Sequence, residues 1–90
     1  MKQLHYKIKY IVEYFDEKNN FWQEWIDVPT LTVLMFNSRK GAIILLKAAL
    51  DTKGTPYAAK NEFLFNTKYR TRQIFKYENE YTGMCQPINI

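Results

Sequence analysis

The stretch LHYKIKYIVEY, residues 4 to 14, decides the fold of this chain. Each even-numbered position from Leu4 to Tyr14 holds an apolar or aromatic residue, and most of the odd positions between them are polar. A period of two over this length is typical of a β-strand that buries one face. We therefore predict a strand over about residues 3–15, with its even-numbered side chains in the core.

A second alternating run follows the first after a short polar turn. The turn spans residues 16–20 and contains two asparagines, a residue type that tolerates a positive φ. The second run covers residues 21–28 and stops at Pro29, which lacks a backbone donor and therefore ends or bends a strand. Two such runs indicate a β-hairpin, in which Trp22 and Ile26 are expected to face the core.

The hydrophobic period changes at Ser38. Residues 30–36 are rich in β-branched and large apolar residues, so we predict a third strand near the centre of the sheet. Ser38 is a good helix N-cap, and apolar residues then recur at helical spacing. A helix over residues 39–51, ended by Gly54, should pack on one face of the sheet.

The remaining sequence adds smaller elements. We predict a short second helix over residues 56–61 and a strand over residues 69–77, while residues 63–65 form either a strand or the end of that helix. Residues 83–90, which begin at Gly83, are expected to form a flexible C-terminal tail. The fold class is α+β: a small antiparallel sheet with a helix on one face, in one domain over residues 1–82.

The predicted core combines the even face of the first strand, one face of the second and the apolar stripe of the helix. The chain has 90 residues, of which 47% are hydrophobic, enough for one core with a thin margin of stability. The core is expected to consist of Tyr6, Ile8, Tyr10, Val12, Trp22, Ile26, Ala42, Leu45, Leu46 and Ala49.

Composition indicates a cytoplasmic protein, in a cell or an infected cell. Cys85 is the one cysteine, so no intramolecular disulfide forms, and a lone thiol fits a reducing compartment. The first residues do not resemble a signal peptide, and no apolar run is long enough to span a membrane. Lys, Asn, Ile, Tyr and Phe, whose codons are rich in A and T, make up about two-fifths of the chain, which fits low-GC bacteria, their phages and their mobile elements. The small size and the lack of an enzyme motif favour a phage or mobile element among these.

Groups for catalysis are scarce. A nucleophilic site needs a base beside its nucleophile, and the one histidine, His5, lies at the opposite end of the chain from Cys85. The sequence has no motif with metal-ligand spacing and too few glycines for a phosphate-binding loop. We therefore expect no enzyme activity, no metal and no cofactor.

Positive charge is concentrated in the second half of the chain. The formal net charge is +4; residues 1–28 sum to −1 and residues 38–60 to +4. Cations interleaved with aromatic rings are typical of surfaces that bind single-stranded nucleic acid. Such a surface would use Arg39, Lys40, Lys68, Tyr69, Arg70, Arg72 and Lys76. A solvated sheet face or a site for an acidic protein would carry the same charges.

Aromatic residues suggest a different surface. If Trp22 faces the core, Trp25 faces outward, together with Phe21, Ile11 and Phe15. Either another element covers these side chains, or they form an interface with a protein partner or a second copy of the chain.

The sequence therefore favours a small protein that binds a host protein or nucleoprotein complex as an accessory factor of a phage or mobile element, with inhibition of that partner as one outcome of binding. A nucleic-acid-binding module is the alternative, and a self-associating virion or assembly component is the second alternative.

Overall fold

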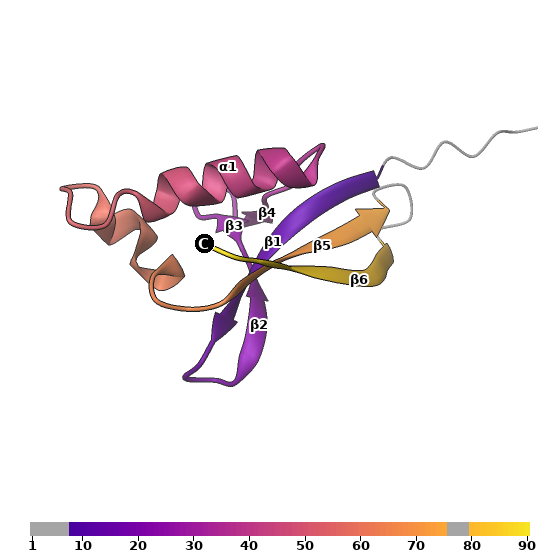
Figure 1. The fold of residues 1–90 in the computed structure, drawn as a ribbon, viewed down its shortest axis with the longest axis horizontal. Coiled ribbons are helices and arrows are strands. Elements are labelled where there is room, and N and C mark those ends of the chain that lie inside the picture. Colours follow the sequence, from indigo (N-terminus) through magenta and orange to yellow (C-terminus); the bar gives the residue numbers. More distant parts are fainter. Residues whose placement is uncertain (1–7, 76–79) are drawn as a thin grey trace, which may run out of the picture.

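Four antiparallel strands form the main sheet. The computed structural model describes residues 8–75 and 80–90. Within them the strand order is β2-β1-β5-β6 (Figure 1). The strands are β1 (Ile8–Asp16), β2 (Phe21–Glu24), β5 (Tyr69–Phe75) and β6 (Glu80–Ile88). The predicted hairpin is present, and the predicted strand over residues 69–77 is confirmed as far as Phe75.

Helix α1 (Arg39–Leu50) packs against one face of this sheet, which we call the inner face, and Figure 1 shows it lying along the strands. The N–H of Gly41 donates to the Ser38 Oγ at 3.0 Å, as expected for an N-cap. The helix ends at Leu50, and Gly54 adopts a φ of +83° in the turn that follows. The predicted α+β fold class, with an antiparallel sheet and one main helix on it, is confirmed.

The segment between the hairpin and the helix differs from the prediction. The expected second strand is interrupted at Trp25, and the expected central third strand is only β4 (Thr32–Val33). It pairs with β3 (Ile26–Asp27) in a separate two-stranded sheet. Between them Leu31 has a φ of 56°, a turn conformation that hydrophobic periodicity does not reveal.

The C-terminal segment is also different. The predicted tail over residues 83–90 is wrong for most of its length, because β6 pairs with β5 as far as Ile88. Ile88 is 6% exposed and belongs to the core, which explains why the segment is ordered against the sheet. The predicted second helix is the 3-10 helix η1 (Ala58–Leu64), which includes part of residues 63–65.

Strand register decides which tryptophan is buried. Asp16 pairs with Phe21, so even-numbered residues of β1 share a face with odd-numbered residues of β2. Trp25, whose N–H donates to the Val12 carbonyl at 2.8 Å, therefore lies on the inner face and is 6% exposed. Trp22 pairs with Phe15 on the opposite, outer face. The predicted placement of the two tryptophans was the reverse of this.

The core lies between α1, η1 and the inner face of the sheet. Its buried members are Val12, Trp25, Ala42, Leu46, Leu64, Tyr69 and Ile88. Val12, Ala42 and Leu46 were predicted, and Tyr10, Ile26 and Ala49 are half-buried. Ile8 and Leu45 were also predicted but are 43% and 44% exposed, and Tyr6 lies outside the described residues.

Candidate binding surface

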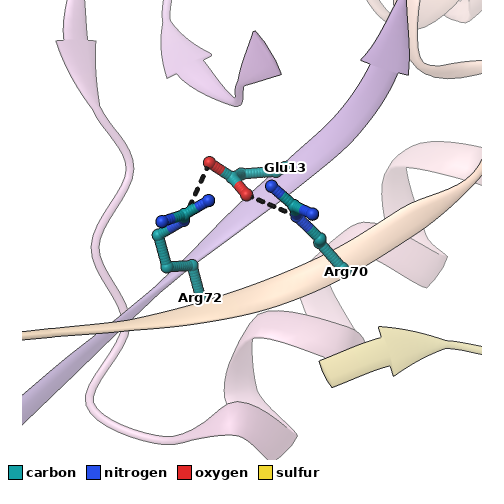
Figure 2. A network of polar contacts seen from close by, with 3 residues as sticks. All are labelled: Glu13, Arg70 and Arg72. Atoms are coloured by element: carbon teal, nitrogen blue, oxygen red, sulfur yellow. Dashed lines mark hydrogen bonds and ion pairs between the residues drawn. The ribbon is translucent and has the colours of Figure 1, made fainter. Parts of the chain in front are cut away.

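A buried carboxylate lies at the centre of the outer face. Glu13, on β1, is 5% exposed. The Arg70 Nε donates to its Oε1 at 2.6 Å, and the Arg72 Nε donates to its Oε2 at 3.1 Å (Figure 2). Both arginines come from β5, where alternate residues point to the same face. Each carboxylate oxygen thus has a charged donor, which offsets the cost of burying Glu13.

Aromatic rings and cations are in contact beside this network. The Arg70 Cζ lies 4.1 Å from the centroid of the Trp22 ring, and the Lys68 Nζ lies 5.7 Å from that of Phe15. The two rings meet edge to face at 5.3 Å. Such cation–π contacts contribute about 0.5–2 kcal/mol each. The rings and cations therefore hold each other in position on a half-exposed surface.

An open groove of about 700 Å³, which we call the outer groove, runs from this cluster to β6. Trp22, Lys68 and Arg70 line one part of it, and Cys85, Pro87 and Ile90 line another. The described residues that line it include two cations and no acidic residue. The groove thus combines apolar surface with two cationic side chains, of which Arg70 is paired with Glu13.

A smaller groove of about 320 Å³, the inner groove, lies on the other face of β6. Arg39, from the start of α1, lines it together with Tyr10 and Met84. The Arg39 Nε donates to the Thr71 Oγ1 at 3.1 Å, and its Nη2 donates to the Pro87 carbonyl at 2.8 Å. Arg39 therefore ties the first turn of the helix to the end of β6.

The predicted nucleic-acid residues do not form one surface. Arg70 and Arg72 lie on the outer face, and Lys68 is exposed beside it. Arg39 and the exposed Lys40 lie at the start of α1, on the inner side. Tyr69 is buried in the core, where its hydroxyl donates to the Leu64 carbonyl, and Lys76 lies outside the described residues.

The predicted protein-binding residues are also divided. Trp25 is covered by the core of its own chain, and Ile11 is fully buried. Phe21 is 47% exposed and Phe15 is half-buried, but the register places them on opposite faces of the hairpin. These four side chains therefore do not form the single exposed patch that the sequence suggested.

Two parts of the candidate surface were missed. Trp22 was assigned to the core. The turn between the paired residues Asp16 and Phe21 contains an even number of residues, and this count places Trp22 on the outer face. Pro87 and Ile90 were assigned to a flexible tail, and nothing in their local pattern indicates a strand edge.

Among the residues that the structure describes, three ionisable groups have a pKa shifted from its ordinary value. Burial raises the pKa of Tyr69, although a hydrogen bond with the Thr67 backbone opposes this. Burial also raises the pKa of Tyr14, and the nearby charge of Asp16 adds to this. Hydrogen bonds from the Asn19 side chain and backbone lower the pKa of Asp16. Tyr69 belongs to the core and also lines the outer groove, whereas Tyr14 and Asp16 lie in the hairpin and do not line it.

Neither a cluster of metal-ligating side chains nor a membrane-spanning helix is found in the described part of the chain. Over residues 8–75 and 80–90, no group of three or more His, Cys, Asp or Glu side chains is placed to hold a metal ion. Cys85 is exposed, and His5 lies outside the described residues. Within the same ranges, no helix has the length and apolar character needed to cross a membrane.

No protein-family model, curated protein or solved structure matches the chain. Its function must therefore be inferred from the surface itself.

Proposed function

We propose that this protein acts by binding, and that it holds a segment of a partner protein in the outer groove. The observation that carries this proposal is the composition of the groove: a half-buried tryptophan, apolar side chains from β6 and two cations around about 700 Å³. Tryptophan and arginine are the residue types that most often dominate the energy of protein interfaces.

The ion pairs with Glu13 support this role because they fix the groove before a partner arrives. Arg70 is held both by the Glu13 carboxylate and by the Trp22 ring, so it loses little conformational freedom on binding. A surface that is ordered in advance pays a smaller entropic cost of association.

Peptide selection tests the proposal. A random peptide library is displayed and selected on the protein, and the dissociation constants of selected peptides are measured by fluorescence anisotropy. Trp22→Ser should weaken binding about tenfold or more, because the anchor ring is removed. Phe21→Ser is the matched control: it removes an exposed ring from the other face of the same strand and should change affinity less than about twofold. Equal affinities for the wild type and Trp22→Ser would contradict the proposal.

A single-stranded nucleic acid is a second candidate, favoured by the contact of Lys68 and Arg70 with the rings of Phe15 and Trp22. Binding to a thymidine oligonucleotide would then fall steeply as salt is raised. An absence of binding at low salt excludes this candidate. A phage or mobile-element setting, an inhibitory role, a virion role and a cytoplasmic location stay predictions from the sequence.

A further inference from the structure

We propose that the partner segment binds as an additional β-strand along the open edge of β6, and that it carries acidic side chains on both faces. This inference rests on the proposed function and names the mode of recognition. In such β-augmentation, backbone hydrogen bonds supply affinity and the grooves beside the edge strand select side chains.

The edge itself is the first argument. β6 is the last strand in the order β2-β1-β5-β6, and no other described strand pairs with its far side. Its nine residues include one charged side chain, Glu80. Edge strands are commonly protected from pairing by lysines or other charges, and β6 has none after Glu80, although Pro87 and a shift of register beyond Arg72 limit the length of edge that can pair. Met84 is 67% exposed on it, and Cys85 is exposed.

Pro87 shows which backbone groups face outward. Proline is found in strands where its missing N–H would point away from the neighbouring strand. Pro87 pairs with Arg70 and Cys85 with Arg72, in one unbroken register. We infer that the N–H and carbonyl of Cys85 face the open edge as well. Because the Pro87 carbonyl already accepts a hydrogen bond from Arg39, the added strand must make its backbone hydrogen bonds to the part of β6 that precedes Pro87, and the segment then continues past Pro87 to reach Lys68 in the outer groove.

Charge complementarity selects the occupant. Successive side chains of an added strand point to opposite faces, so they enter the outer and the inner groove in alternation. Lys68 lines the outer groove beside Arg70, whose charge is already paired with Glu13, and Arg39 lines the inner one, while neither groove has an acidic residue among its described lining. A strand with carboxylates on either face therefore meets positive charge on both sides of β6.

A backbone substitution separates this mode from simple docking in the groove. The probe is a blocked peptide of alternating glutamate and valine, about eight residues long. In two-dimensional NMR spectra it should shift the amide signals of Met84, Cys85 and Gln86. Cys85→Pro removes an outward donor without breaking the β5–β6 ladder, and it should weaken binding about tenfold. Cys85→Ser keeps the N–H and should bind as the wild type does.

Charge is tested in the same assay. Lys68→Glu should weaken binding of the glutamate peptide, whereas Lys47→Glu, the same change at an exposed helix position, should leave it unchanged. The inference is overturned if the peptide leaves the β6 signals unshifted, if Cys85→Pro binds as tightly as Cys85→Ser, or if a lysine–valine peptide binds equally well. It is also overturned if sedimentation shows that a second copy of the chain occupies the edge, or if a thymidine oligonucleotide shifts the same signals. If Trp22→Ser loses binding while Cys85→Pro binds as the wild type does, the proposed function is retained and the added strand is rejected.

Discussion

At the scale of single residues, Glu13 organises the outer face. It is a charged residue at a buried position of β1, and the two arginines that neutralise it stand two positions apart on β5. Their side chains are 20% and 22% exposed, so each keeps some water while it holds the carboxylate. The sequence indicated positive charges at Arg70 and Arg72 but not their partner, because a glutamate in an alternating strand is ordinarily a solvated residue.

Replacing Glu13 tests the strength of this network. Glu13→Gln keeps the shape but leaves two neighbouring arginines without a counter-charge, so the free energy of unfolding should fall by about 1–3 kcal/mol. Glu62→Gln, the same change at an exposed position of η1, is the control and should change it by less than about 0.5 kcal/mol. Urea denaturation measures both. Unchanged stability in Glu13→Gln would mean that the ion pairs only fix geometry.

Tyr69 makes stability sensitive to alkaline pH. Its pKa is raised in the folded protein above the ordinary value of 10.0, so the folded state favours the neutral phenol. The resulting stability is complete below pH 10.0 and is lost as pH rises through the folded-state pKa. Tyr69→Phe should therefore lose less stability than the wild type between about pH 9 and pH 11. Urea denaturation across that pH range measures the stability of both proteins. If both lose stability in parallel, the effect belongs to other groups such as Tyr14.

At the scale of elements, predictability followed the length and regularity of the hydrophobic pattern. β1 and α1 were predictable because each repeats its period several times and α1 starts at a capping serine. Which residues of β2 face the core was not predictable, since this depends on how many residues the turn before Phe21 contains. β6 was missed because it contains Gly83 and Pro87, residues that usually indicate loops. The outer groove joins β2, β5 and β6, so these errors hid it.

The orientation of α1 can be tested with two neighbouring leucines. Leu46 is fully buried against the sheet, whereas Leu45 is 44% exposed. Leu46→Ala should lower the free energy of unfolding by about 2–5 kcal/mol, because it leaves a cavity in the core. Leu45→Ala removes the same atoms from a partly solvated position and should cost less than about 1 kcal/mol. Similar losses in the two variants would show that the helix is rotated from the described position.

At the scale of the whole molecule, the last strand joins the core to the candidate binding surface. Ile88 is buried in the core on the inner face, Pro87 and Cys85 line the outer groove, and Arg39 links the same strand to α1. Stability and the proposed binding therefore involve the same segment. A free C-terminal tail would not contribute to the core. Truncation of the chain therefore tests whether this segment is a structural strand or a free tail.

Ending the chain after Gly83 should unfold the protein or lower its free energy of unfolding by more than the roughly 2–5 kcal/mol expected for the loss of one buried isoleucine. Removal of this segment exposes the β5 edge and strips Ile88 from beside Tyr69. Ending the chain after Ile88 instead removes only the exposed residues Asn89 and Ile90, and it should leave the unfolding midpoint nearly unchanged. Circular dichroism during thermal unfolding compares the two. Because Ile90 lines the outer groove, the shorter truncation should still weaken peptide binding. A loss of affinity at constant stability would distinguish the binding role of the chain end from its structural role.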